Sequence, residues 1–228
     1  MIIVSYIVIT IFIIGFLYKI WLYASTPSPL KIPTTPAATS ALDVGKRLTG
    51  EVVFFKSLFK SNKWIWLGGY LFHIAFLLII LRHIRYFIYP VPDILLMVQP
   101  IGIYAGIFII LPILYLLLRR LFVDRVRYIS KGGDFIILFL LLAIIFSGIL
   151  LKFFYRADLI QVKAFIIGLL TFNPSAFPYE NTLFLIHFSL VLGLLLYFPF
   201  SKLIHAGGIF FSPTLNQIDN SREKRHVV

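Results

Sequence analysis

Residues 65–89, IWLGGYLFHIAFLLIILRHIRYFIY, and residues 182–205, TLFLIHFSLVLGLLLYFPFSKLIH, decide the fold. Each is an apolar run of the length that crosses a bilayer, about 20 residues. Each also carries two histidines, His73 and His83 in the first and His187 and His205 in the second. A histidine in hydrocarbon is costly and marks a functional residue. These stretches therefore predict a membrane protein with a site between two of its helices.

The composition of the whole chain agrees with a membrane protein. Apolar residues make up 60% of the sequence and charged residues 13%, and the mean hydropathy is +0.97. There is no cysteine, so the chain has no disulfide, thiolate metal site or iron–sulfur cluster of its own. The formal net charge of +12 is better explained by membrane topology than by nucleic-acid binding.

Five apolar segments are expected to cross the membrane as helices in one all-α integral-membrane domain, residues 1–228. They cover about residues 2–24, 65–89, 98–118, 135–155 and 182–203, followed by a tail, 204–228. The first segment is interpreted as a helix and not a signal peptide, because no basic residue precedes its apolar run and Lys19 lies on its far side.

The basic residues predict the orientation. Sixteen of the 21 lysines and arginines fall on one side of these spans, mostly in segments 25–64 and 119–134 and near the C-terminus. Because positive residues stay in the cytoplasm, we expect the N-terminus outside and the C-terminus inside, in the cytoplasmic membrane. Four arginines of segment 119–134 would then either fix this orientation in the membrane or contact an acidic surface of a partner protein. They are Arg119, Arg120, Arg125 and Arg127.

Two connections are longer than turns. Segment 25–64 begins with a proline-rich stretch that cannot form a continuous helix. Its second half mixes apolar and basic residues at near-helical spacing, which indicates an interfacial helix, a docking surface for a soluble subunit, or both. Segment 156–181 is too short and interrupted to span, and we expect it to lie along or dip into the outer leaflet, ending at Asn173-Pro174.

The four histidines pair by depth. The second span runs from inside to outside and the fifth in the reverse direction, so His83 pairs with His187 outside, and His73 with His205 inside. Two histidines on each of two helices can hold two haems, each iron between two imidazoles. His73 and His83 are ten residues apart, about 15 Å along a helix axis, whereas His187 and His205 are five full turns apart on one helix face, about 27 Å. Because these two axial separations do not match, we expect a tilted or bent helix.

Other interpretations of these residues remain. The histidines could be hydrogen-bonded interior groups or a proton relay. Glycines near them, Gly68, Gly69, Gly148 and Gly193, favour a bulky planar group nearby but serve equally in close helix packing. His226 lies in a charged tail and is expected to be solvated.

The spacing of the histidines and the segment PFSKLIH, residues 199–205, resemble the membrane cytochrome b family of the respiratory nitrate reductase gamma subunit. The tail, AGGIFFSPTLNQIDNSREKRHVV, is similar to a narrower branch. That branch is the M subunit of the sulfite-reductase-associated menaquinol complex and the related heterodisulfide-reductase-like menaquinol-oxidising enzymes. The resemblance covers nearly the whole chain.

The resemblance implies cofactors, partners and a role. It implies two haems b, an outer one on His83 and His187 and an inner one on His73 and His205, with menaquinol oxidised beside the outer haem. It implies a cytoplasmic iron–sulfur partner related to the heterodisulfide reductase catalytic subunit, within an anaerobic respiratory complex of sulfur metabolism. Further membrane subunits and an external cytochrome c could belong to it.

Several other residues have candidate roles. Arg82 and Arg85 flank His83 and could pair with haem propionates or extend to lipid phosphate. Tyr86 and Tyr89 are expected in the interfacial aromatic belt. The external acids Asp93, Asp158 and Glu180 could accept quinol protons. Polar tail residues could contact the cytoplasmic subunit, namely Asn216, Gln217, Asp219 and Asn220.

We therefore expect a dihaem subunit that oxidises quinol and passes electrons to a partner, an oxidoreductase component of a larger complex. One alternative is a stand-alone transmembrane haem reductase for a small acceptor, although the chain has no flavin or nucleotide domain. The other is a non-redox, proton-linked transporter or anchor, which would be colourless when purified.

Overall fold

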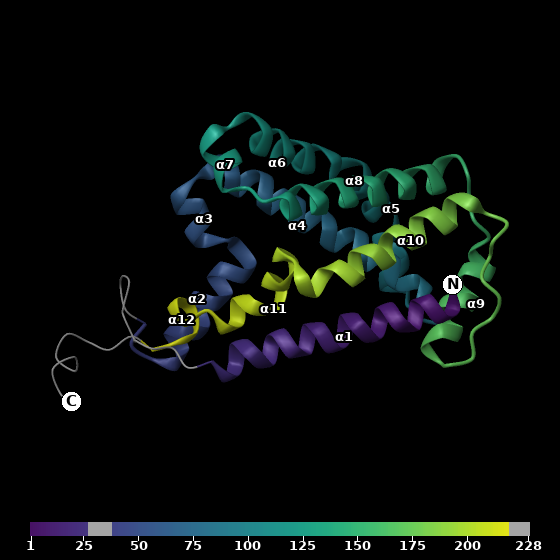
Figure 1. The fold of residues 1–228 in the computed structure, drawn as a ribbon, viewed down its shortest axis with the longest axis horizontal. Coiled ribbons are helices and arrows are strands. Elements are labelled where there is room, and N and C mark those ends of the chain that lie inside the picture. Colours follow the sequence, from purple (N-terminus) through teal and green to yellow (C-terminus); the bar gives the residue numbers. More distant parts are fainter. Residues whose placement is uncertain (27–37, 219–228) are drawn as a thin grey trace. The chain divides into compact units, whose positions relative to one another are not determined.

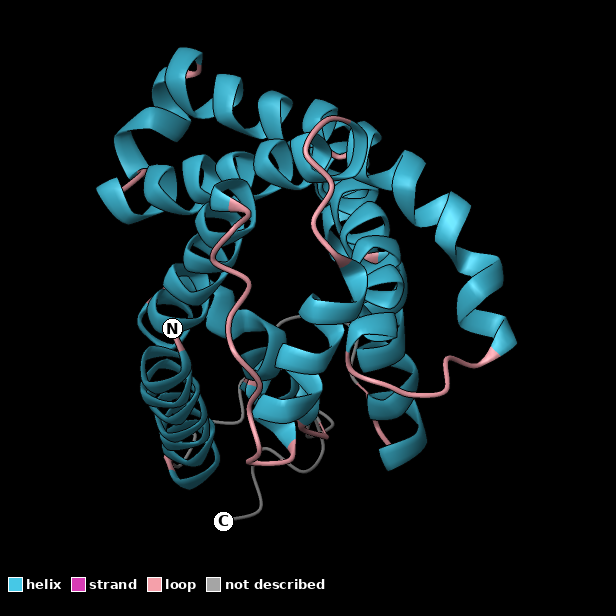
Figure 2. Cartoon of the chain, turned by 90° about the vertical axis from the view of Figure 1, so that its right-hand side faces the viewer, coloured by secondary structure: helices cyan, strands magenta, loops and turns pink. Residues whose placement is uncertain are grey.

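The structure is a computed structural model that describes residues 1–26 and 38–218. Every regular element in these residues is a helix, and none is a strand (Figure 2). The all-α prediction is therefore confirmed for the described part of the chain. Residues 27–37 of the proline-rich stretch, and Asp219, Asn220 and His226 of the tail, lie outside it.

Five helical segments are long and apolar enough to cross a membrane, and Figure 1 labels the α-helices that form them. They are Ile2–Ser25, which is α1; Lys63–Tyr86, which is α4 (Lys63–His83) with η1 (Ile84–Tyr86); Asp93–Phe122, which is α5 (Asp93–Phe108) with α6 (Ile110–Phe122); Gly132–Phe153, which is α8; and Thr182–Phe200, which is α10 (Thr182–Tyr197) with η2 (Phe198–Phe200).

The remaining helices are short. They are α2 (Ala41–Phe54), α3 (Lys56–Ser61), α7 (Asp124–Ile129), α9 (Leu159–Leu170), η3 (Lys202–Ile204), α11 (His205–Gly208), η4 (Ile209–Phe211) and α12 (Pro213–Asn216). The chain divides into two compact units, which are described separately. The first comprises Met1–Phe12 and Leu67–Tyr197, and the second Ile13–Trp66 and Phe198–Val228.

The third span is longer than predicted and is broken at Ile109, between α5 and α6. Pro112 explains the break, because it has no amide to donate to the carbonyl four residues earlier, which belongs to Phe108.

The expectation that one continuous helix joins His187 and His205 is wrong. α10 ends at Tyr197, and Pro199 lies in the 3₁₀ turn that follows. Proline disfavours helical backbone at the preceding residue and lacks an amide. Ser201 then starts a new turn, since its hydroxyl accepts a hydrogen bond from the amide of Leu203. The two histidines therefore do not share one helix face over about 27 Å.

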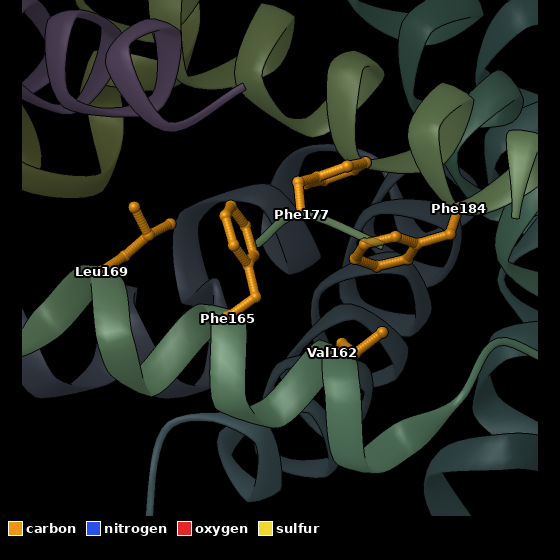
Figure 3. Close-up of a cluster of buried hydrophobic side chains, with 5 residues drawn as sticks. All are labelled: Val162, Phe165, Leu169, Phe177 and Phe184. Carbon is orange, nitrogen blue, oxygen red and sulfur yellow. The ribbon is translucent and has the colours of Figure 1, made fainter. Parts of the chain in front are cut away.

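Segment 156–181 contains one short helix, α9, which is too short to span a membrane, as predicted, and which packs on an aromatic cluster of the first unit. Figure 3 shows the buried members of this cluster, Val162, Phe165, Leu169, Phe177 and Phe184. The Phe165 ring is fully buried and meets Phe177 edge-on, with 5.0 Å between ring centroids. α9 also contacts η1, the turn directly after His83, so it covers the end of the unit where that histidine lies.

The N-terminus is held at the same end of the first unit. The Met1 amine donates a hydrogen bond to the Tyr179 hydroxyl at 3.1 Å, and the Tyr6 hydroxyl donates to the Leu169 carbonyl at 3.1 Å. Figure 1 shows the start of α1 beside α9.

The second unit joins α2 to the C-terminal segment. Ser40 caps the start of α2, since its hydroxyl accepts from the amide of Asp43, and Phe55 caps the end in the left-handed region, with φ 50°. Arg47 of α2 donates to the carbonyls of Leu215 at 3.0 Å and Gln217 at 2.6 Å. The helix expected in the second half of segment 25–64 is therefore present, and it holds the start of the tail.

Candidate functional site

His83 is the last residue of α4. Its Nδ1 lies 2.7 Å from the carbonyl oxygen of Ile79, one helical turn earlier. A carbonyl oxygen can only accept, so Nδ1 carries the hydrogen of this bond. The neutral imidazole then has its lone pair on Nε2, which is the nitrogen that can ligate a metal.

His187 lies in α10, and a serine from the neighbouring helix α8 orients it. Its Nδ1 is 2.8 Å from Oγ of Ser147, and that hydroxyl donates in turn to the Ile144 carbonyl at 3.0 Å. Because the serine hydrogen is committed to Ile144, Oγ accepts from Nδ1–H. Here too Nε2 is left as the ligating nitrogen.

A glycine beside Ser147 gives the His187 ring its space. A Cβ placed on Gly148 would lie 3.2 Å from the ring atom Cε1, closer than ordinary van der Waals contact. The packing role that we allowed for glycines applies to Gly68 instead, where a Cβ would meet the ring of Tyr115 at 2.5 Å.

His83 and His187 lie in the same compact unit. Tyr86, three residues after His83, and Phe188, next to His187, pack against one buried aromatic cluster. The two histidines come from α4 and α10, the two helices that were expected to hold them. Their joint ligation of one haem remains a prediction.

The other predicted pair is divided between the units. His73 lies in the middle of α4 in the first unit, with Nδ1 2.7 Å from the Gly69 carbonyl. His205 begins α11 in the second unit, with Nδ1 2.8 Å from the Lys202 carbonyl. Each therefore has the same tautomer as His83, and their pairing stays a prediction.

Two arginines flank His83 in a network that the sequence analysis only partly anticipated. The Arg82 stem packs against Gly102 of α5, where a Cβ would lie 2.7 Å from the arginine Cβ. Its Nε is buried without a hydrogen-bond partner. Arg85 donates from Nη1 to Gln99 Oε1 at 3.1 Å, and the Gln99 amide donates to the Arg82 carbonyl at 3.3 Å.

Ser147 and Gln99 are the two site residues that sequence analysis missed. Both are polar groups in apolar spans, and that position was the available signal. Neither is titratable, and their partners come from distant parts of the chain. Their roles became visible only once the helices were packed.

The remaining candidates are placed at this end of the first unit. Tyr89 is 81% exposed, and the Lys163 ammonium lies 4.7 Å from its ring centroid. The Asp158 carboxylate caps α9 by accepting from the amide of Ile160 at 2.8 Å, which gives it a structural role. Asp93 opens α5, and Glu180 lies in the turn before α10.

The sequence matches a known family over most of its length. Residues 55–215 match the nitrate reductase gamma subunit family. The chain belongs to this family. It is therefore a multi-pass membrane protein, in keeping with its five apolar spans.

Two curated archaeal relatives cover nearly the whole chain. The Hdr-like menaquinol oxidoreductase cytochrome b-like subunit of Archaeoglobus fulgidus is 39% identical over 270 residues, covering 99% of this chain and 81% of the relative. The protein of the same name from Archaeoglobus profundus is 34% identical over 267 residues, covering 97% and 80%. The resemblance that was drawn from the histidine spacing and the tail is thus confirmed.

Proposed function

We propose that this chain is the dihaem cytochrome b subunit of a menaquinol-oxidising complex in the cytoplasmic membrane. It exchanges electrons between menaquinol and a cytoplasmic iron–sulfur partner related to the heterodisulfide reductase catalytic subunit. The family match and the names of the two archaeal relatives support this role. A place in anaerobic respiration and sulfur metabolism belongs to the same proposal.

The observation that carries the proposal is the shared state of the four histidines. In each ring Nδ1 donates to an oxygen of the chain, three of them backbone carbonyls and one the Ser147 hydroxyl. A second hydrogen bond of this kind orients a metal-ligating imidazole and raises its basicity. The donor set therefore fits haem iron held through Nε2.

The residues have separate roles in this function. His83 and His187 would ligate the outer haem, and His73 and His205 the inner haem. Bound haem supplies one-electron redox chemistry, while the protein sets axial ligands, hydrogen bonds and burial. Arg82 and Arg85 would bind haem propionates, because guanidinium groups pair with carboxylates in two-point geometry.

The proposed sidedness follows from the basic residues. Menaquinol would bind near the outer pair and release its protons outside, with Asp93 and Glu180 as available acceptors. The tail, which Arg47 holds at Leu215 and Gln217, lies on the cytoplasmic side in this arrangement and would face the iron–sulfur partner.

A reduced-minus-oxidised spectrum of the purified chain, with a haem-to-protein ratio, tests the proposal. We expect two low-spin haems b per chain, both reduced by a menaquinol analogue. His83→Ala should lose one haem, whereas the tail variant His226→Ala should keep both.

The two alternatives give different results. A colourless protein would refute the cytochrome and leave a proton-linked transporter or an anchor. Two haems that turn over with a small acceptor and no partner would indicate a stand-alone reductase.

A further inference from the structure

Lys152, in the last turn of α8, lies on the helix face that meets His187. It follows Gly148 by four residues, and residues four apart share one face of a helix. Gly148 is the residue whose Cβ would touch the His187 ring. Lys152 therefore lies one turn beyond His187, toward the end of the unit where α8 finishes.

Three arginines lie at the same end of the first unit as this lysine, namely Arg82, Arg85 and Arg156. They come from α4, from η1 and from the loop after α8. Tyr86 of η1 and Leu151 of α8 pack against the same buried aromatic cluster, so the residues next to them, Arg85 and Lys152, lie at this end too. Four cations are thus found at the end of the unit that carries His83 and His187, although the sequence places two of them about 70 residues from the other two.

Among the described residues, no carboxylate neutralises these cations. Within residues 1–26 and 38–218, the ion pairs that we find join Arg120 to Asp134 and Arg127 to Asp124, and neither includes any of the four. The Nε of Arg82 is a buried donor with no acceptor. Like charges that are partly removed from water repel each other, so the cluster calls for an anion from outside the chain.

From these observations we propose that Lys152 joins Arg82 and Arg85 in a cation site that binds the propionate carboxylates of the outer haem. The proposal rests on the proposed function. A haem held between His83 and His187 would have two propionate carboxylates to place near these cations, and carboxylates bind both guanidinium and ammonium groups.

Lipid phosphate is the other source of anionic oxygens for these cations. A lysine in the last turn of a helix also favours the helix dipole and can extend toward lipid headgroups. Those roles account for a single cation at the surface. They do not account for the buried Nε of Arg82, which lies away from solvent and lipid.

A redox titration of the complex in nanodiscs tests the role of Lys152. The oxidised haem iron carries one more positive charge than the reduced iron, so a nearby cation favours the reduced form. Lys152→Gln should therefore lower the midpoint potential of the outer haem, about tenfold in the reduced-to-oxidised ratio, or 59 mV for a one-electron couple. The inner haem should be unchanged.

Two variants control for charge and fold. Lys152→Arg keeps the charge and should keep the wild-type potential. Lys163→Gln removes a lysine that lies on the Tyr89 ring at the same end and should change the ratio less than twofold.

The outcomes separate the two proposals. Wild-type protein without haem overturns the proposed function. Two haems with an unchanged outer potential in Lys152→Gln overturn the propionate site alone. An effect that appears only in nanodiscs with anionic lipid, and vanishes with zwitterionic lipid, assigns Lys152 to lipid phosphate and also overturns it.

Discussion

The two ends of the first unit differ in whether their positively charged side chains have carboxylate partners. At the end formed by α6, α7 and the start of α8, Arg120 lies 3.3 Å from the carboxylate of Asp134, whose side chain is only 4% exposed. The Asp134 carboxylate also accepts from the Lys131 amide, and Arg120 donates to Ser130. At the His83 end, four cations lack a carboxylate among the described residues. Among the described residues, the first end has its own counter-charge, whereas the second end, in our proposal, receives its counter-charge from haem propionates.

Among the predicted changes, Asp134→Asn should have the largest effect, a loss of folding stability at the end that has its own counter-charge. It leaves Arg120 partly buried without its counter-charge, which costs about 3 kcal/mol. Thermal unfolding in detergent measures the loss. Asp124→Asn is the matched control, because the Asp124–Arg127 pair is exposed, with side-chain exposures of 90% and 64%, and should cost less than about 1 kcal/mol. Equal losses of stability in the two variants would mean that the buried ion pair contributes no more to stability than the exposed one.

Ser147→Ala should weaken the outer haem site without breaking the fold. The change removes the acceptor that orients His187, and loss of such a partner lowers affinity by about 10- to 100-fold. Haem release to apomyoglobin measures the affinity. Ser189→Ala on the exposed side of α10 is the control and should release haem at the wild-type rate. Wild-type retention in Ser147→Ala would show that the hydrogen bond does not support ligation.

Arg82→Gln should change stability in opposite directions with and without haem. In haem-free protein it removes repulsion and a buried donor without a partner, which should stabilise the fold by about 1 kcal/mol. In haem-loaded protein it removes a propionate partner, which should destabilise by about as much. Thermal unfolding of protein purified from haem-deficient cells and from haem-supplemented cells measures the two stability changes. The same sign in both forms would contradict the idea that this end is incomplete without an anion.

Gly148→Ala should give the smallest effect. A Cβ 3.2 Å from Cε1 displaces the His187 ring by a few tenths of an ångström, while alanine gains about 1 kcal/mol of helix propensity. The unfolding temperature should therefore change little, and the electron paramagnetic resonance spectrum of the outer haem should shift. Gly106→Ala, whose Cβ meets no atom within 4 Å, should leave the spectrum unchanged. An unshifted spectrum in Gly148→Ala would show that the added methyl group fits beside the His187 ring without displacing it.

The sequence was sufficient where one physical effect dominates. Long apolar runs predicted the five spans, because a bilayer demands a minimum helix length. The histidines were found because a titratable group in hydrocarbon is rare. His83 and His187 lie in one compact unit, and their pairing by depth stays a prediction.

Where two effects compete, the sequence was not sufficient. Pro199 was visible, but neighbouring helices often satisfy the backbone around proline within spans, so the end of α10 at Tyr197 was missed. Ser147 and Gln99 gain their roles from residues 40 and 14 positions away, and a single sequence has no signal for such contacts.

The end of α10 at Tyr197 has a consequence for engineering. His187 is fixed within a long helix, whereas His205 opens a helix of four residues after a run of short turns. A residue inserted between Pro199 and Lys202 would displace one proposed ligand and leave the other in register. This joint is therefore the place to change one of the two proposed haem sites without changing the other.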